Sequence, residues 1–323
     1  MRSLPLLPFV SGLCRLCRLC DLCGLWRLVR RGSLPGLPGW RGLASLAPVL
    51  VVMVMLAMPG AVKAAPKADL WPDWQVYDPQ STIMVDHSEW QGVLDRFVDQ
   101  PEAGVTTFDY RRALSERANG IYAVAHYIDQ MVDISVSRLN RAEQMAYWIN
   151  LYNALTVKVV LDHYPVASIR DIDISPGLFA SGPWGKKLVR IEGRTLSLDD
   201  IEHRILRPIW QDARIHYAVN CASVGCPALA RDAYDAKRIE SQLDQAARGF
   251  INHARAIHSD GDGGFVISSL YDWYRDDFGA GDAQFVAHLL TFAGPELTAQ
   301  LDHIGGFDVS DDEYDWALNA PQS

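Results

Sequence analysis

The chain has 323 residues, of which 49% are hydrophobic, with 30 Lys and Arg against 39 Asp and Glu. Residues 1–64 hold eight of the basic residues and a single acid, which leaves 22 basic and 38 acidic residues over 65–323. This acidic excess excludes a protein whose main work is binding phosphate backbones, so we expect no nucleic-acid partner. The hydrophobic content is enough for a packed core and excludes intrinsic disorder.

Residues 1–64 have the pattern of a leader that contains a secretory signal peptide. Arginines precede the apolar run Val49–Met58, and small residues around Ala64 follow it. The run is shorter than the about 20 apolar residues that span a bilayer. We therefore expect cleavage after Ala64, export to the periplasm, and contact with the membrane only transiently, through this segment.

The first 28 residues hold four cysteines at every third position, from Cys14 to Cys23. Thiolates at such spacing can hold zinc or an iron–sulfur cluster. These cysteines, however, precede the signal segment and read as a short repeat with no fold around them. We expect residues 1–28 to be an over-long gene model, with the true start nearer Val29.

The rest of the chain is predicted to be one α+β domain, mostly helical with a small sheet, behind the signal peptide. Residues 65–88 are a lead-in with Trp and Pro and no clear period, and residues 89–320 form the domain. Helices are predicted over 89–98, 110–117, 120–131, 141–163, 197–206, 239–253, 271–278 and 281–293. Strands are predicted over 188–191, 215–220 and 265–268.

The predicted helix over 141–163 carries a polar stripe beside its apolar one. Its members follow a spacing of three to four residues: Glu143, Tyr147, Asn150 and Asn153. Asparagine is unfavourable inside a helix, and buried amides need hydrogen-bond partners. The stripe therefore predicts either a cleft or an internal hydrogen-bond network.

Two cysteines remain after the expected cleavage, Cys221 and Cys226. They can form a disulfide in an oxidising compartment, or one can be a nucleophilic thiol activated by a histidine. They can also be zinc ligands together with His203 or His216, or inert buried thiols. The spacing alone leaves these alternatives open.

The histidines near these cysteines have competing interpretations. Alternation along the predicted strand places His216 on one face with Asn220, where it can be a hydrogen-bonded core residue. Glu202 and His203 are adjacent on the predicted helix over 197–206, so their side chains point about 100° apart. We expect one of the two to be buried and the other solvated.

Four segments of the chain resemble the domain of unknown function 547 family. They are residues 143–155, 197–203, 216–227 and 314–319, and the resemblance spans roughly residues 85–320. The residues shared with the family pattern are Glu143, Asn150, Asn153, Glu202, His203, His216, Cys221 and Cys226. The resemblance implies a bacterial, often exported protein, and it implies no particular activity.

The first hypothesis is an enzyme with a cleft between the 141–163 helix and residues 216–226. The proposed roles are Cys221 as nucleophile, His203 or His216 as base, Glu143 or Glu202 orienting the imidazole, and Asn150 donating to an oxyanion. The reaction would be acyl or thiol transfer, or hydrolysis, on a cell-envelope peptide or amide. The chain lacks nucleotide-binding and metalloprotease motifs, and we expect no cofactor and no metal.

The second hypothesis is a non-catalytic periplasmic binding module. Here Cys221 and Cys226 form a disulfide, and the polar stripe braces a groove for a small-molecule, peptide or glycan ligand of the envelope. The residues assigned to binding are Tyr147, Trp148, Asn153, Trp184, Trp273 and Cys226. A free, alkylatable thiol would favour the enzyme, and a disulfide would favour the binding module.

Overall fold

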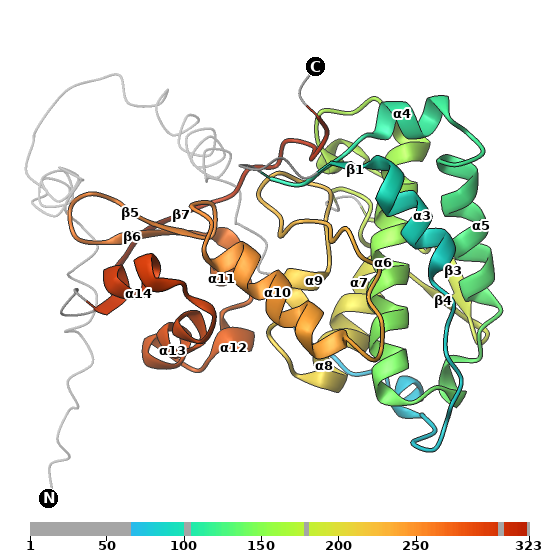
Figure 1. Ribbon diagram of the computed structural model, residues 1–323, viewed down its shortest axis with the longest axis horizontal. Coiled ribbons are helices and arrows are strands. Elements are labelled where there is room, and N and C mark those ends of the chain that lie inside the picture. Colours follow the sequence, from blue (N-terminus) through green and yellow to red (C-terminus); the bar gives the residue numbers. More distant parts are fainter. Residues whose placement is uncertain (1–65, 100–104, 178–180, 303–306, 322–323) are drawn as a thin grey trace, which may run out of the picture. The chain divides into compact units, whose positions relative to one another are not determined.

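The computed structural model describes residues 66–99, 105–177, 181–302 and 307–321 (Figure 1). The leader expected over 1–64 therefore lies outside the described residues. Across the described ranges, no helix is long and apolar enough to cross a membrane. The fold is α+β, as predicted, with helices around small separate sheets.

The longest helix, α6 (Arg141–His163), has the predicted bounds. It begins after Asn140, whose side-chain oxygen accepts a hydrogen bond from the backbone of Glu143 and caps the helix. Pro165 follows its end, because proline cannot continue a helix. Every residue from Glu143 to Val157 is buried, so α6 runs through the core rather than over it.

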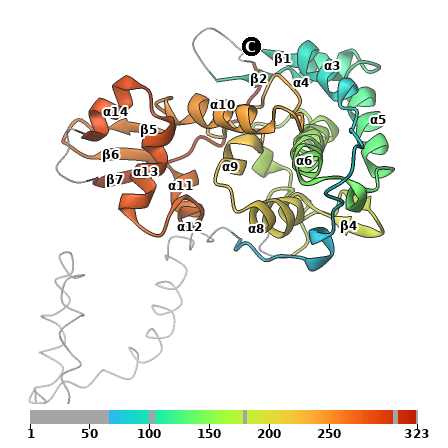
Figure 2. The ribbon, with the colours of Figure 1, turned by 60° about the horizontal axis from the view of Figure 1, so that its bottom comes forward.

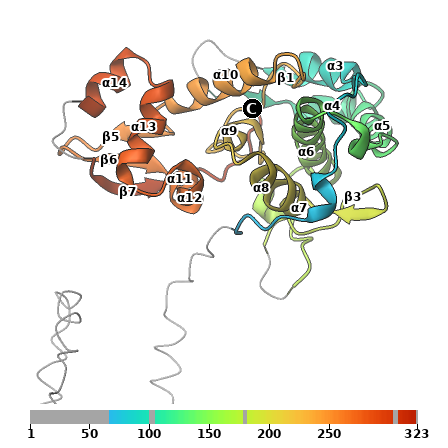
Figure 3. The same ribbon diagram turned by 90° about the horizontal axis from the view of Figure 1, so that it is seen from below.

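Other helices surround α6. The N-terminal helices are α3 (Ser88–Phe97), α4 (Tyr110–Ser115) and α5 (Ile121–Val132). Helix α5 packs on α6, and α3 packs on α5. Figure 2 and Figure 3 both show α6 between α5 and the short helix α9 (Ile215–Ala218). Short 3₁₀ turns complete this part: η1 (Pro72–Gln75), η2 (Val136–Arg138) and η3 (Ile169–Asp171).

The C-terminal part has a second hydrophobic cluster around a three-stranded sheet (Figure 1, orange to red). Strand β6 (Phe265–Ser268) pairs antiparallel with β5 (Ile257–Ser259) and parallel with β7 (Val309–Glu313). The helices here are α10 (Ile239–Ile251), α13 (Asp282–Phe292) and α14 (Pro295–Asp302). The parallel pairing places β7, which is close to the C-terminus, beside β6.

Two hairpins lie outside that sheet. Strand β1 (Val98–Asp99) pairs with β2 (Thr107–Phe108), and β3 (Val189–Ile191) pairs with β4 (Arg194–Leu196). The β3–β4 turn is formed by Glu192 and Gly193, both with positive φ, which is the backbone of a tight hairpin turn. Strand β3 confirms the strand predicted over 188–191.

The strand predicted over 215–220 is wrong, because Ile215–Ala218 is the helix α9. The backbone N–H of Val219 donates to the carbonyl oxygen of Ile215, which is a helical bond. All four residues of α9 are buried. The sequence of this short segment therefore does not distinguish the period of a helix from that of a strand.

The helix predicted over 271–278 is two short helices, α11 (Ser269–Trp273) and α12 (Arg275–Phe278). The helix predicted over 197–206 is also divided. It consists of α7 (Leu198–Asp200), the π-helical turn η4 (Ile201–Leu206) and then α8 (Arg207–Trp210). Its predicted start is confirmed, because Ser197 and Asp200 form a reciprocal capping box.

Candidate active site at the cysteine loop

Residues 220–227, the cysteine loop, follow α9, and the buried Asn153 of α6 holds the start of this loop in place. The side chain of Asn153 accepts from the backbone N–H of Asn220 at 2.8 Å and donates to the carbonyl of Ala218 at 3.0 Å. Within the loop, Asn220 donates to the carbonyl of Pro227 at 2.8 Å. The polar stripe of α6 thus supplies the internal network that was one of its two predicted roles, and it positions Cys221.

The C-terminal segment, residues 314–320, lies against the cysteine loop. The backbone N–H groups of Val224 and Gly225 donate to the carbonyls of Ala317 and Asp315, each at 2.8 Å. A Cβ at position 225 would lie 2.7 Å from the backbone nitrogen of Asp315, so this approach requires glycine. The loop is therefore held from both sides, by α6 and by the end of the chain.

Cys221 is half-buried and its sulfur faces hydroxyl groups. The Sγ atom lies 2.9 Å from Oη of Tyr314 and 3.2 Å from Oγ of Ser223. The two hydroxyl oxygens are 2.9 Å apart. The backbone N–H of Cys221 donates to Sγ of Cys226 at 2.9 Å. Both cysteines are free thiols here, so the structure does not contain the disulfide of the second hypothesis.

The two thiols differ in how readily they ionise. A hydrogen bond from the thiol of Cys226 lowers the pKa of Cys221, against burial, and the hydroxyls of Ser223 and Tyr314 lower it further. Burial raises the pKa of Cys226 well above that of an ordinary thiol, and burial likewise raises the pKa of Tyr314. Cys221 is therefore the thiol that ionises first, and its neighbours stay protonated as donors.

A second group of polar side chains, the histidine cluster, lies in the fold near this loop. Its members are Glu202, His203, Arg207, His216 and Asp277. Nε2 of His216 is 2.7 Å from Oδ2 of Asp277. The guanidinium of Arg207 donates to both oxygens of Asp277, from Nε at 2.6 Å and from Nη2 at 3.1 Å.

Glu202 connects the two histidines. Its Oε1 is 3.8 Å from Nδ1 of His203 and 3.8 Å from Nδ1 of His216. Tyr152 of α6 donates to its other oxygen at 3.0 Å. The ring of Tyr274 stacks on His216 with centroids 4.2 Å apart. The structure thus brings together three of the predicted site residues, with Glu202 rather than Glu143 beside the imidazoles.

Burial lowers the pKa of His203 to about 4, so this ring is neutral at pH 7. Its Nδ1 lies 3.0 Å from Nη1 of Arg207, which fits a neutral imidazole that accepts from the guanidinium. Burial opposes ionisation of Asp277, but hydrogen bonds from His216 and Arg207 outweigh it and hold its pKa below the usual range. The cluster is thus a carboxylate–guanidinium pair with a neutral histidine.

Glu202 and His203 are both buried, at 6% and 4% exposure, so the prediction that one is solvated is wrong. Both residues lie in the π-helical turn η4, where five of the six residues are buried and the N–H of Arg207 bonds to the carbonyl of Glu202 five residues earlier. The wider turn changes the angle between successive side chains. Single π turns are frequent at functional sites.

Two predicted catalytic residues lie elsewhere on α6. Glu143 accepts a hydrogen bond from the backbone of Val85 at 3.2 Å, and burial raises its pKa. Asn150 accepts from the N–H of Tyr234 at 2.9 Å and donates to its carbonyl at 2.8 Å. Its amide is therefore committed to the backbone and is not placed to stabilise an oxyanion at Cys221.

The aromatic residues assigned to the predicted groove lie in two different environments. Trp148 is buried and packs edge-on against Trp74, while Tyr147 is buried and donates to the carbonyl of Met131 at 2.9 Å. Both belong to the core. The half-buried side chains form instead an aromatic cluster: Trp184, Trp273, Tyr314 and Trp316. The hydroxyl of Tyr314 joins this cluster to Cys221.

Comparison with known proteins gives one match. Residues 136–251 match the family model described as "Protein of unknown function, DUF547". This segment of the chain is similar to the DUF547 family. No curated protein and no solved structure matches the chain. The matched segment contains α6, Glu202, both histidines and the cysteine loop.

Four residues of the candidate site were missed by sequence reasoning: Arg207, Ser223, Asp277 and Tyr314. Asp277 lies in the short helix α12 beside the acidic Asp276, and this sequence gives no local signal of a buried partner. Tyr314 lies in a segment that the family resemblance had marked, so its motif position could have pointed to the site.

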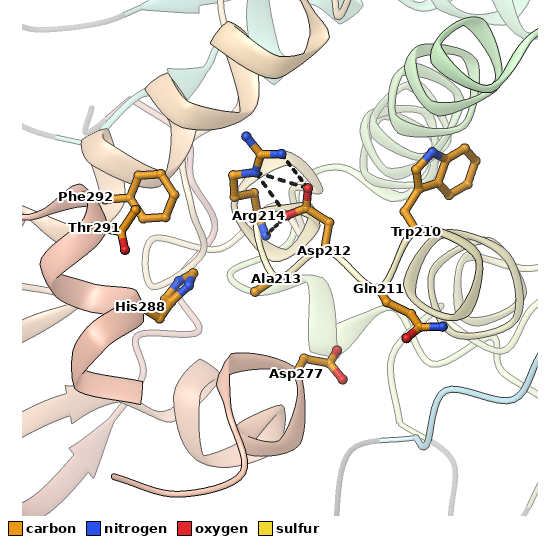
Figure 4. Close-up of a pocket in the computed structure, with 9 residues that line it drawn as sticks. All are labelled: Trp210, Gln211, Asp212, Ala213, Arg214, Asp277, His288, Thr291 and Phe292. Atoms are coloured by element: carbon orange, nitrogen blue, oxygen red, sulfur yellow. Dashed lines mark hydrogen bonds and ion pairs between the residues drawn. The ribbon is translucent and has the colours of Figure 1, made fainter. Parts of the chain in front are cut away.

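A cleft of about 440 Å³ opens beside the histidine cluster (Figure 4). Asp277 and His288 line it, and Arg214 is tied to Asp212 at its edge. Over the described ranges, no group of three or more His, Cys, Asp and Glu side chains could hold a metal ion.

Proposed function

We propose that this protein is an exported cell-envelope enzyme with Cys221 as its nucleophile. The reaction would be thiol-dependent acyl or thiol transfer, or hydrolysis, on a peptide or amide. The observation that carries the proposal is the pair of hydroxyls at 2.9 and 3.2 Å from the sulfur of Cys221, a residue that is itself half-buried. A thiolate is the nucleophilic form of cysteine, and hydrogen-bond donors around the sulfur favour it.

The hydroxyl groups also suit the transition state of acyl transfer. Attack by Sγ on a carbonyl carbon places negative charge on an oxygen close to the sulfur. Tyr314 and Ser223 present two hydroxyls within hydrogen-bond distance of that sulfur and of each other. We assign these hydroxyls the oxyanion role that the sequence had assigned to Asn150.

The histidine cluster has a supporting role in this proposal. In the described part of the chain, the side-chain hydrogen bonds of Cys221 go to Ser223, Tyr314 and Cys226, and His216 bonds to Asp277 instead. Activation of the thiol therefore does not depend on a thiolate–imidazolium pair. The cluster ties α8, α9 and α12 together behind the loop.

The substrate would lie on the aromatic cluster. Trp273 is 4.8 Å from Tyr314 and 5.5 Å from Trp316 between ring centroids, and all three side chains are half-buried. Partly exposed aromatic rings next to a nucleophile offer apolar area for the flanking part of a peptide or glycopeptide. We propose such an envelope ligand as the partner of this surface.

The proposal is tested with an aryl acetate, whose acyl group transfers readily to a thiolate. The protein is mixed with p-nitrophenyl acetate, quenched in acid, and weighed intact. We expect a burst of nitrophenol and one acetyl group on Cys221, retained in Cys226→Ser and absent in Cys221→Ser. An equal burst in Cys221→Ser, or no acetyl adduct at Cys221, would contradict the proposal.

The aromatic cluster alone also favours a second candidate, a non-catalytic binding module. That module does not need a reactive thiol, and its disulfide would only brace the cysteine loop. In that case the double variant Cys221→Ser, Cys226→Ser would keep ligand binding and lose stability. In the enzyme, the same variant loses the acetylation described above.

A further inference from the structure

Arg255, which follows α10, reaches the cysteine loop with its guanidinium. Its Nη1 donates to the carbonyl of Val224 at 3.0 Å, and its Cζ lies 5.3 Å from the ring centroid of Phe250. Val224 stands in the loop between Ser223 and Cys226. The guanidinium therefore lies against the cysteine loop, and Cys226 and Tyr314 are the ionisable groups that act on it.

The guanidinium of Arg255 has unused donors. Nε is buried and has no hydrogen-bond partner within the described ranges of the chain. Nη2 also has no partner among the described residues. Of the unpaired nitrogens of Arg255 only Nε is buried, so Nη2 reaches the surface. An arginine that is half-buried and donates one hydrogen bond leaves most of its binding capacity free.

In the part of the chain that the structure describes, Arg255 also has no counter-charge. The other half-buried or buried arginines near this site have one, since Arg207 pairs with Asp277 and Arg214 with Asp212. Among the described residues, no carboxylate forms an ion pair with Arg255. Burial lowers the pKa of the Arg255 guanidinium, and the ionisable groups Cys226 and Tyr314 oppose this by raising it. Removing a cation from water without a partner is costly, which favours a bound anion.

We propose that Arg255 forms a carboxylate subsite at the cysteine loop that carries Cys221, so that the substrate is a peptide or amide with a free carboxylate. Nη2 would donate to the carboxylate in a charge-assisted hydrogen bond, while Nη1 stays on Val224. The subsite rests on the proposed function, because it selects the substrate that Cys221 attacks. It sets the substrate class and takes no part in the chemical step.

Two alkylating reagents of nearly the same size test this subsite. Iodoacetate carries a carboxylate and iodoacetamide does not, and both are attacked by Sγ with loss of iodide. The rate at Cys221 is measured with each reagent by peptide mass analysis, and the ratio of the two rates is compared between variants. The ratio cancels changes in thiol pKa, because such changes alter both rates equally.

We expect Arg255→Gln to lower the iodoacetate-to-iodoacetamide ratio roughly tenfold, the size of one hydrogen bond to a charged group. Arg255→Lys should keep part of the preference. Arg248→Gln removes the same charge from an exposed position on α10 and should leave the ratio unchanged. Urea unfolding of each variant verifies that it is folded.

The outcomes separate the two proposals. If both reagents modify Cys221 at a ratio that Arg255→Gln does not change, the carboxylate subsite is wrong and the nucleophile stands. If Arg248→Gln lowers the ratio as much as Arg255→Gln, the effect is one of overall charge and the subsite is also wrong. If neither reagent modifies Cys221 in the folded protein, the proposed function fails and the subsite with it.

Discussion

His216 of α9 and Asp277 of α12 meet at 2.7 Å between Nε2 and Oδ2, although 61 residues separate them. The same carboxylate binds Arg207 of α8, which is 70 residues away. Since α12 belongs to the part of the chain with the second hydrophobic cluster, this carboxylate links that part to the helices around α6.

Replacing Asp277 by alanine should destabilise the fold. The change leaves Arg207 buried without a counter-charge, and we expect the free energy of unfolding to fall by about 3 kcal/mol. Urea denaturation measures it. The exposed neighbour Asp276 is the matched control, and Asp276→Ala should change stability by less than about 0.5 kcal/mol. Equal losses in both variants would show that Asp277 does not link the two parts.

Stability should fall as the solution is acidified. Burial lowers the pKa of His203 from 6.5 to about 4, so the unfolded chain binds its proton first and stability is lost as pH drops through this window. The slope for one such histidine is at most about 1.4 kcal/mol per pH unit. Urea midpoints measured between about pH 7 and about pH 4.5 give the slope.

In that experiment, His203→Gln should make the slope shallower without abolishing it. His87 and His288 also have a pKa of about 4 because of burial, and both remain to titrate. The control is His126→Gln, since His126 is mostly exposed. If His203→Gln kept the full slope of stability against pH, this would contradict the conclusion that His203 is buried as a neutral ring.

The two asparagines of α6 should separate stability from reactivity. Asn153→Ala leaves the carbonyl of Ala218 and the N–H of Asn220 without partners, and Asn150→Ala does the same to Tyr234. Each should cost about 2 to 4 kcal/mol in urea unfolding.

Only the first of these variants should change the chemistry of the thiol. Asn153 holds the residue before Cys221, so Asn153→Ala should alter the rate of its alkylation, whereas Asn150→Ala should not. The rates are measured in the folded state at low urea. A change of the same size in both variants would mean that the loop is not positioned through Asn153.

Tyr314→Phe should raise the pKa of Cys221. The substitution removes the hydroxyl that lies 2.9 Å from the sulfur and keeps the ring in the aromatic cluster. The pH at which alkylation reaches half its maximal rate should therefore move upward. Tyr110→Phe is the control, because that hydroxyl donates to Asn319 and not to the thiol. An unchanged midpoint in Tyr314→Phe would contradict the role of this donor.

The local sequence pattern was sufficient to predict the elements whose apolar face or helix cap is formed by residues close together in the chain. Helix α6 follows from regular apolar spacing and Pro165, and the start of α7 follows from the Ser197–Asp200 pair. The requirement that Asn150 and Asn153 have partners also followed from helix propensity. The identity of those partners could not be predicted, because they are backbone groups 65 to 84 residues away in the chain.

The remainder depended on tertiary packing. Helix α9 is too short and too buried to show a period, so its residues were predicted as a strand. The π turn at Glu202 is a local departure from regular geometry that residue type does not specify. The contact of Tyr314 with Cys221 requires the chain end to return over 93 residues to the cysteine loop, which no local pattern encodes.

The most direct test of a nucleophilic Cys221 is the intact mass of the protein from its native source, with and without iodoacetamide, under non-reducing conditions. The prediction is rapid single alkylation of the folded protein at Cys221, with Cys226 modified only after denaturation. A mass lower by the two hydrogens of a disulfide, with no alkylation even after denaturation, would contradict it.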